Sequence, residues 1–247
     1  MFGMNPFGWR FMGTLFGVLM LPILYLFARK LLHKTWLSCG ATVLFAFDFM
    51  HFTQTRIATI DVYSTFFVLL MYYFMYQYLC LSFYDTPLKK TLLPLGACGI
   101  CMGLGVACKW TGVYAGCGLA LLFFSSLYGR YREYLYAKKD PDGSSGGISH
   151  RQIIDRFLPC AGRTVLFCLI FFVLLPAVIY LLSYLPFRDY ADRGLMARML
   201  HNQTTMFGYH SNLESVHPYS SVWYEWPIIR RPIWYYSRII TQTANGG

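Results

Sequence analysis

The sequence predicts an all-α, polytopic membrane protein with about six transmembrane helices and an outer, partly helical tail. Two observations predict this class: the amino-acid composition and a series of long apolar runs. Of the 247 residues, 56% are apolar, 19% are aromatic and only 13% are charged. A soluble domain carries about 25% charged residues. The composition therefore excludes a disordered chain and argues against an ordinary soluble enzyme.

Six segments are apolar and long enough to cross a bilayer, which takes about 20 helical residues. The second and fourth are short, which tilt or local thinning of the bilayer would accommodate. We expect residues 1–185 to form a transmembrane domain and residues 186–247 an extracytoplasmic tail. The six segments are Phe11–Ala28, Trp36–Phe52, Ile57–Tyr84, Thr91–Cys108, Gly112–Tyr128 and Thr164–Leu185.

The basic residues predict the orientation of these segments. The net charge of +10 would suggest a nucleic-acid partner in a soluble protein, but here it fits basic loops at an anionic membrane face, and no nucleic acid is expected. The positive-inside rule places Met1 and the tail outside and loop 129–163 in the cytoplasm. The loops opposite hold only Arg10, Arg56 and Lys109, whereas the inner loops hold Arg29, Lys30, Lys34, Lys89, Lys90, Arg130, Arg132, Lys138, Lys139, Arg151, Arg156 and Arg163.

Turn-forming, cysteine and glycine residues carry further expectations. The run Asp140–Gly147 is rich in Pro, Gly and Ser, which predicts a flexible linker. Cys98 and Cys101 have the spacing of a redox pair, but they lie in an uncharged apolar run, so we interpret them as small buried residues. Glycines spaced four apart let helices pack closely. These pairs are Gly13 with Gly17, Gly99 with Gly103, and Gly112 with Gly116.

Polar groups at membrane depth are costly and therefore informative. The richest cluster runs from Asp48 to Asp61, between the second and third segments, and contains Arg56. Lys109, followed by Trp110, lies between the fourth and fifth segments. Both cations are predicted to face outward, so they could converge on one anion near the membrane surface. A lipid phosphate suits such a site, since its tail can lie among the helices.

Three alternatives remain open at this point. Arg56 could pair with Asp61, while Lys109 extends to the lipid headgroups. Asp48, His51 and Asp61 could instead form a proton pathway, which would suit a proton-coupled transporter. The Trp- and Tyr-rich tail from His217 to Tyr236 suits either an interfacial belt or sugar stacking.

In the tail, residues Arg193–Met206 could form an amphipathic helix on the membrane surface. No metal site or cofactor is expected, because His201, His210 and His217 have no Asp, Glu or Cys partner at ligand spacing. Asn202-Gln203-Thr204 matches the pattern for N-glycosylation, which matters only in a host with that machinery.

Four segments resemble the protein O-mannosyltransferases, multi-spanning membrane enzymes of the GT-C glycosyltransferase class. Asn5–Gly17 is similar to the entry into the family's second membrane helix. His51–Asp61 resembles its Gln/Ser-x-Arg-x-x-x-x-Asp segment, and Gly103–Gly112 its Gly-x-x-x-x-x-Lys-Trp-x-Gly segment. His217–Tyr236 resembles the outer loop of bacterial members.

The resemblance implies transfer of mannose from a polyprenyl- or dolichyl-phosphate-mannose donor to Ser or Thr hydroxyls of exported acceptor proteins. Transfer would occur at the outer face of a bacterial plasma membrane, with inversion at the sugar carbon and without a metal. A carboxylate base would take the acceptor proton. Arg56 and Lys109 would bind the donor phosphate, supported by Asp61, Trp110 and His217.

The sequence departs from the family pattern at its ends. Family members carry a catalytic acidic pair in an outer loop after a first membrane helix, with a His-Pro-Pro-Leu-type segment downstream, and neither is present here. We therefore expect an internal or truncated portion of a longer enzyme, inactive by itself. Asp61 matches a different family position and is not expected to be the base.

Overall fold

A computed structural model describes residues 5–186, 194–213 and 220–231. The chain divides into two units, Met1–Met196 and Ala197–Gly247, and each is described by itself. Arg193 and His217 lie outside the described residues, so the roles predicted for them stay predictions.

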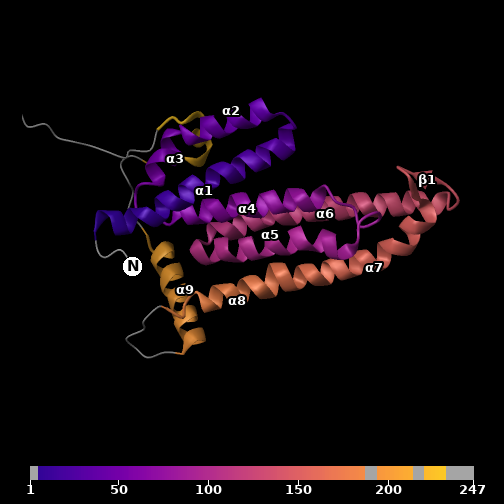
Figure 1. The fold of residues 1–247 in the computed structure, drawn as a ribbon. Helices are drawn as coiled ribbons and strands as arrows, with labels where there is room; N and C mark the ends of the chain where they lie inside the picture. The colour runs from indigo at the N-terminus through magenta and orange to yellow at the C-terminus, as the bar shows by residue number, and fades with distance from the viewer. Residues whose placement is uncertain (1–4, 187–193, 214–219, 232–247) are drawn as a thin grey trace, which may run out of the picture. The chain divides into compact units, whose positions relative to one another are not determined.

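The first unit is built from helices, with one short hairpin, which confirms the all-α membrane class (Figure 1). The hairpin consists of β1 (Ser144–Ser145) and β2 (Ile148–Ser149), and it joins the two longest helical segments. The helices are α1 (Pro6–Leu32), α2 (Thr35–Ala46), α3 (Phe49–Gln54), α4 (Asp61–Leu79), α5 (Leu88–Cys108), α6 (Thr111–Lys139), α7 (His150–Leu169), the π-helix η1 (Ile170–Leu174) and α8 (Leu175–Leu182).

The helices of this unit run back and forth between two ends of one bundle. At one end, the Tyr76 hydroxyl of α4 donates to the carbonyl of Lys30 in α1. At the other end, Lys109 after α5 reaches Asp61 at the start of α4. We call the end that holds Asp61 and Lys109 the Asp61 end, and the end that holds the basic loops the Arg130 end.

Four described helical segments are long and apolar enough to cross a membrane. The predicted second and third segments are not among them: α2 ends after 12 residues, and α4, which occupies the third, falls outside the four. Asp48 follows α2 and caps α3, where its carboxylate accepts a hydrogen bond from the backbone N–H of His51 at 2.7 Å. The prediction of one continuous helix from Trp36 to Phe52 is therefore wrong. The four segments are Pro6–Leu32, Leu88–Cys108, Thr111–Lys139 and His150–Leu182.

Close approach at glycines confirms the packing interpretation of their spacing. A methyl group on Gly17 would lie 2.3 Å from the Thr55 side chain. One on Gly99 would lie 2.4 Å from the backbone oxygen of Phe171, and one on Gly112 2.8 Å from the Val106 nitrogen. These contacts join the segment after α3 to α1, the π-helix to α5, and α6 to the end of α5.

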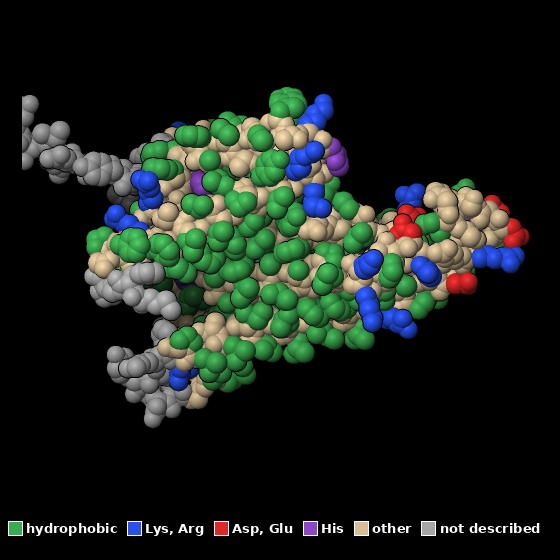
Figure 2. All heavy atoms as spheres, viewed as in Figure 1, with side chains coloured by type: hydrophobic (Ala, Val, Ile, Leu, Met, Phe, Trp, Pro, Cys, Tyr) green, Lys and Arg blue, Asp and Glu red, His purple; other side chains and the backbone are tan. Residues whose placement is uncertain are grey.

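The main core lies between α4, α5 and α6. Its buried members include Met75, Leu95 and Phe123, together with Cys98 and Cys101. The two cysteines pack as small apolar residues, as predicted. Large apolar side chains also cover the outside of the unit, where a lipid environment would receive them (Figure 2).

A second core lies at the Arg130 end, where α6 and α7 continue past the main core (Figure 1). Charged side chains gather over this extension (Figure 2). The core contains Phe83, Tyr84, Tyr134, Ala137, Ile153 and Phe157. Loop 129–163 is accordingly mostly helical.

The predicted flexible linker Asp140–Gly147 takes part in the hairpin of β1 and β2. Gly146 and Gly147 have φ values of 57° and 81°, which glycine adopts at little cost. The description of the segment as turn-rich is confirmed, but it has a defined turn rather than an irregular path.

The second unit contains most of helix α9 (Leu195–Ser211) and the short 3-10 helix η2 (Trp223–Ile228). Helix α9 confirms that the tail is partly helical. None of its residues is buried in the described structure. Asn202 and Thr204 of the glycosylation pattern lie within this helix, where the Thr204 hydroxyl donates to the carbonyl of His201.

Candidate phosphate-binding site

The charged pair at the Asp61 end joins two helix termini. The Lys109 ammonium donates to the Asp61 carboxylate, and the two atoms are 2.5 Å apart. Lys109 ends α5 in an extended conformation, and its backbone N–H still bonds to the carbonyl of Gly105. Asp61 is the first residue of α4. The side chains keep 37% and 50% of their exposure, so both remain accessible from outside the bundle.

Each charge suits the helix end at which it lies. A carboxylate is favourable at a helix N-terminus and an ammonium at a C-terminus, because the backbone dipoles leave opposite partial charges there. A partly exposed ion pair contributes only about 0–1 kcal/mol to stability. The pair is therefore more informative as a means of orienting Lys109 than as a source of stability.

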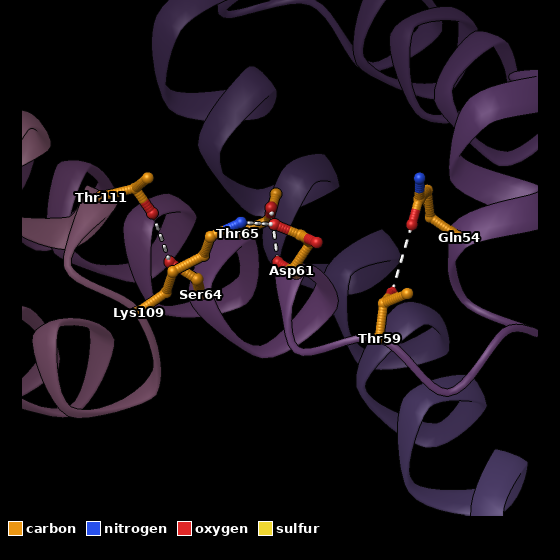
Figure 3. A network of polar contacts seen from close by, with 7 residues as sticks. All are labelled: Gln54, Thr59, Asp61, Ser64, Thr65, Lys109 and Thr111. Carbon is orange, nitrogen blue, oxygen red and sulfur yellow. Dashed lines mark hydrogen bonds and ion pairs between the residues drawn. The ribbon is translucent and has the colours of Figure 1, made fainter. Parts of the chain in front are cut away.

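Hydroxyl groups surround this pair, as Figure 3 shows. The Thr65 hydroxyl donates to the backbone carbonyl of Asp61 at 2.9 Å. The hydroxyls of Ser64 and Thr111 lie 3.4 Å apart and join the start of α4 to the start of α6. Farther along the loop, the Thr59 hydroxyl donates to the Gln54 side-chain oxygen. The start of α4 is thus tied to the start of α6, and the loop before it is tied to α3.

A cavity of about 490 Å³ opens beside Asp61. Helices α1 and α2 contribute apolar walls, and the polar lining comes from α3, the loop after it and α4. Asp48 and His51 share this cavity with Asp61, although Asp48 is used as the cap of α3. The polar lining residues are Asp48, His51, Gln54, Thr55, Asp61 and Thr65.

Arg56 lies on the loop that leads from α3 into Asp61, and it is exposed. Its guanidinium carbon lies 4.0 Å above the ring of Phe52, a cation–π contact that leaves the edges of the guanidinium open. The preceding residue, Thr55, is buried against Gly17 and fixes the loop. Asp61 pairs with Lys109 and not with Arg56, so the alternative of an Arg56–Asp61 pair is wrong.

Trp110 follows Lys109 and anchors the α5–α6 turn to α8. Its indole N–H donates to the Tyr180 hydroxyl at 3.0 Å, and the two rings meet edge to face. The Tyr180 and Tyr184 hydroxyls are in turn 3.1 Å apart. Trp110 therefore helps to fix the backbone from which Lys109 projects.

Sequence reasoning gave no role to Thr65 or Tyr180. Thr65 could have been found, because it lies four residues after Asp61 and therefore on the same face of a helix. The pairing of Tyr180 with Trp110 depends on tertiary contact across 70 residues, for which the sequence holds no local signal. In the described part of the chain, no three His, Cys, Asp or Glu residues gather as metal ligands.

Fold and site together define a polytopic membrane protein with a cation and a carboxylate exposed beside a polar cavity at one end of its bundle. The model of the dolichyl-phosphate-mannose-protein mannosyltransferase family matches residues 1–190. The chain belongs to this family, which confirms the resemblance drawn from its motifs. No solved structure matches the chain significantly.

Curated relatives agree with the family. A polyprenol-phosphate-mannose–protein mannosyltransferase of Mycolicibacterium smegmatis is 25% identical over 95% of this chain and 50% of its own length. One of Mycobacterium tuberculosis is 24% identical over 95% of this chain and 49% of its own length. The chain thus spans about half the length of the curated relatives that it matches. These comparisons give no support to the transporter alternative.

Proposed function

We propose that the protein containing this chain transfers mannose from a polyprenyl- or dolichyl-phosphate donor to Ser or Thr hydroxyls of exported proteins. The family and the names of the relatives support this proposal. The protein would be a multi-pass component of the bacterial plasma membrane, with the Asp61 end facing outward. The basic loops at the opposite end support this orientation.

Within this reaction, Arg56 and Lys109 bind the phosphate of the donor. A lysine ammonium has three N–H donors, and Asp61 takes one of those of Lys109. Two remain for a phosphate. Arg56 offers the planar donor set that matches phosphate oxygens, and no described acidic residue pairs with it. The observation that carries the proposal is the exposed Lys109–Asp61 pair, with Arg56 on the loop that enters Asp61.

The chemical step requires positive charge where the phosphate departs and a carboxylate that accepts the acceptor's proton. Attack from the face opposite the phosphate inverts the sugar carbon. We assign Asp61 a positioning role, because its carboxylate already pairs with Lys109. Trp110 positions the same turn, and His217 stays a predicted supporting residue. No metal enters this proposal, and we assign the base to no residue of this chain.

The test is an assay of mannosyl transfer. It uses a full-length protein that contains this chain and has the length of the curated relatives. Polyprenyl-phosphate-mannose and a Ser/Thr-rich peptide serve as substrates, and Lys109→Ala is compared with Lys89→Ala from the opposite end. We expect mannosylated peptide from the parent protein and from Lys89→Ala, with much less from Lys109→Ala. Absence of mannose transfer by the parent protein would contradict the proposed function.

A further inference from the structure

A second polar cavity, of about 580 Å³, lies at the Arg130 end, far along α6 from Lys109. It opens between the loop before α5, the final turns of α6, the hairpin of β1 and β2, and the start of α7. Three of its polar residues follow one face of α6, and one begins α7. Its polar side chains are Ser82, Tyr84, Arg132, Glu133, Tyr136, Ser145 and His150.

The position of this cavity along α6 corresponds to the depth of lipid headgroups. From Thr111 to Gly129 the helix rises about 27 Å at 1.5 Å per residue, close to the roughly 30 Å thickness of a bilayer's hydrocarbon core. Gly129 marks the near edge of the cavity and Tyr136 lies two turns beyond it. A ligand here would meet the polar part of a lipid.

His150 presents a buried polar atom without a partner. Only 2% of its surface is exposed, and its Nε2 forms no hydrogen bond with any described residue. Its Nδ1 lies 2.5 Å from the backbone oxygen of Asp140. A carbonyl can only accept, so Nδ1 carries the proton, and in the neutral ring Nε2 is left as an acceptor. The histidine therefore lacks a donor that a ligand would supply.

Arg132 and Glu133 give the cavity one charge of each sign. Neither side chain forms an ion pair or hydrogen bond with a described residue, and both are exposed. Arg132 suits a phosphate. Glu133, like Nε2 of His150, suits a group that donates hydrogen bonds. The lining therefore suits a ligand in which a short linker joins a phosphate to a positively charged N–H donor.

We propose that this cavity binds a phosphoethanolamine headgroup, with its phosphate at Arg132 and its ammonium between Glu133 and Nε2 of His150. A choline headgroup has the same charge but no N–H donor, so it leaves His150 unsatisfied. A purely anionic phosphate ester meets the repulsion of Glu133. The predicted cytoplasmic side of the membrane supplies the ligand, and the proposal does not depend on mannosyl transfer.

The experiment measures retention of short-chain phosphatidylethanolamine and phosphatidylcholine with identical acyl chains by the purified protein that carries this chain, using native mass spectrometry. We expect the ethanolamine lipid to be retained about tenfold more, the ratio expected for one additional charge-assisted hydrogen bond. Glu133→Gln should lower this ratio, with His150 still accepting from the ammonium, whereas Asp155→Asn, an exposed acid on α7 outside the cavity, should keep it. Equal retention of the two lipids by the parent chain would overturn the proposal.

Two further arms separate the parts of the inference. Arg132→Gln should weaken retention of both lipids, while Arg151→Gln, whose partner is Asp142, should not. An Arg132→Gln variant that retains both lipids like the parent chain would contradict the phosphate assignment. Free phosphoethanolamine that displaces the lipid at equal concentration identifies a soluble ligand, and failure to displace it identifies the membrane lipid. Either source carries the proposed headgroup.

Discussion

The ammonium of Lys109, after the last turn of α5, lies 2.5 Å from the carboxylate of Asp61, on the first turn of α4, although 48 residues separate them. The contact joins the N-terminal end of α4 to the C-terminal end of α5. It also leaves Arg56, only five residues before Asp61, with its charge directed over Phe52 instead of into an ion pair.

Replacement of Arg56 tests the donor site most directly. Arg56→Ala should weaken donor use by about ten- to a hundredfold, because the phosphate loses a contact worth roughly 1.5–3 kcal/mol. Arg56→Lys should recover only part of this, since lysine lacks the bidentate geometry. Donor titration of mannosyl transfer measures both. Arg10→Ala, an exposed arginine of α1, is the control, and equal effects of Arg10→Ala and Arg56→Ala would remove the special role of Arg56.

Lys109→Ala should act on the same donor step as Arg56→Ala. We expect the double variant to lose less than the product of the two single losses, because both residues contact one anion. A double-mutant cycle on the donor titration gives the coupling. Strict additivity would indicate two independent roles.

Asp61→Asn separates positioning from proton transfer. The variant keeps the shape of the side chain and removes its charge, so Lys109 loses its fixed orientation and donor use should fall only a few-fold. The loss of an essential base would lower transfer by about a hundredfold or more. Asp48→Asn is a matched control, since asparagine caps a helix as well as aspartate does. A hundredfold fall in turnover with Asp61→Asn alone would return Asp61 to the catalytic candidates.

Glycine packing makes a prediction for stability. Gly99→Ala should destabilise the bundle by about 1–3 kcal/mol, because the new methyl group overlaps the backbone of Phe171. Gly162→Ala in α7 has no atom within 4 Å of the new methyl and should be neutral or stabilising. Thermal unfolding midpoints in detergent provide the comparison. A Gly99→Ala midpoint at or above that of Gly162→Ala would be inconsistent with the packing described.

Arg130 should be structural. It is 5% exposed, and its guanidinium donates to the Tyr78 hydroxyl at 2.8 Å and the Leu81 carbonyl at 2.6 Å. Arg130→Lys cannot make both contacts and should cost about 2–4 kcal/mol. The exposed Arg163→Lys should cost less than about 0.5 kcal/mol. Denaturation in mixed micelles reports the difference, and similar midpoints would show that the buried contacts contribute little.

Reporter fusions test the orientation. A fusion at Asp142 should report the cytoplasm and one at Ser211 the exterior, because the basic loops are retained inside. Placement of both reporters on the same side would overturn the topology.

The four candidate spans were predictable because bilayer thickness sets the length of an apolar helix, and composition records that directly. The helix break at Asp48 was not predictable from the sequence, since it depends on the Asp48 carboxylate accepting a hydrogen bond from the N–H of His51 rather than from water. Arg56 and Lys109 could be singled out as rare charges in apolar surroundings. The partner of Asp61 could not be predicted, because Arg56 is nearer to Asp61 in the sequence. Only the folded bundle brings Lys109 to Asp61. The cavity at His150 carried no local signal.

The loop between α4 and α5 has a consequence for biosynthesis. The carbonyl of Tyr84 accepts hydrogen bonds from Gln152 and Arg156, which lie 68 and 72 residues later in the chain. At 5–20 residues per second, a ribosome needs roughly 4–14 s to synthesise those 72 residues. During that interval α4 and α5 wait with their connecting loop hydrated, and only the emergence of α7 completes its hydrogen bonds. A nascent chain stalled before Arg156 should therefore expose this loop to protease, while a chain released after α7 should protect it.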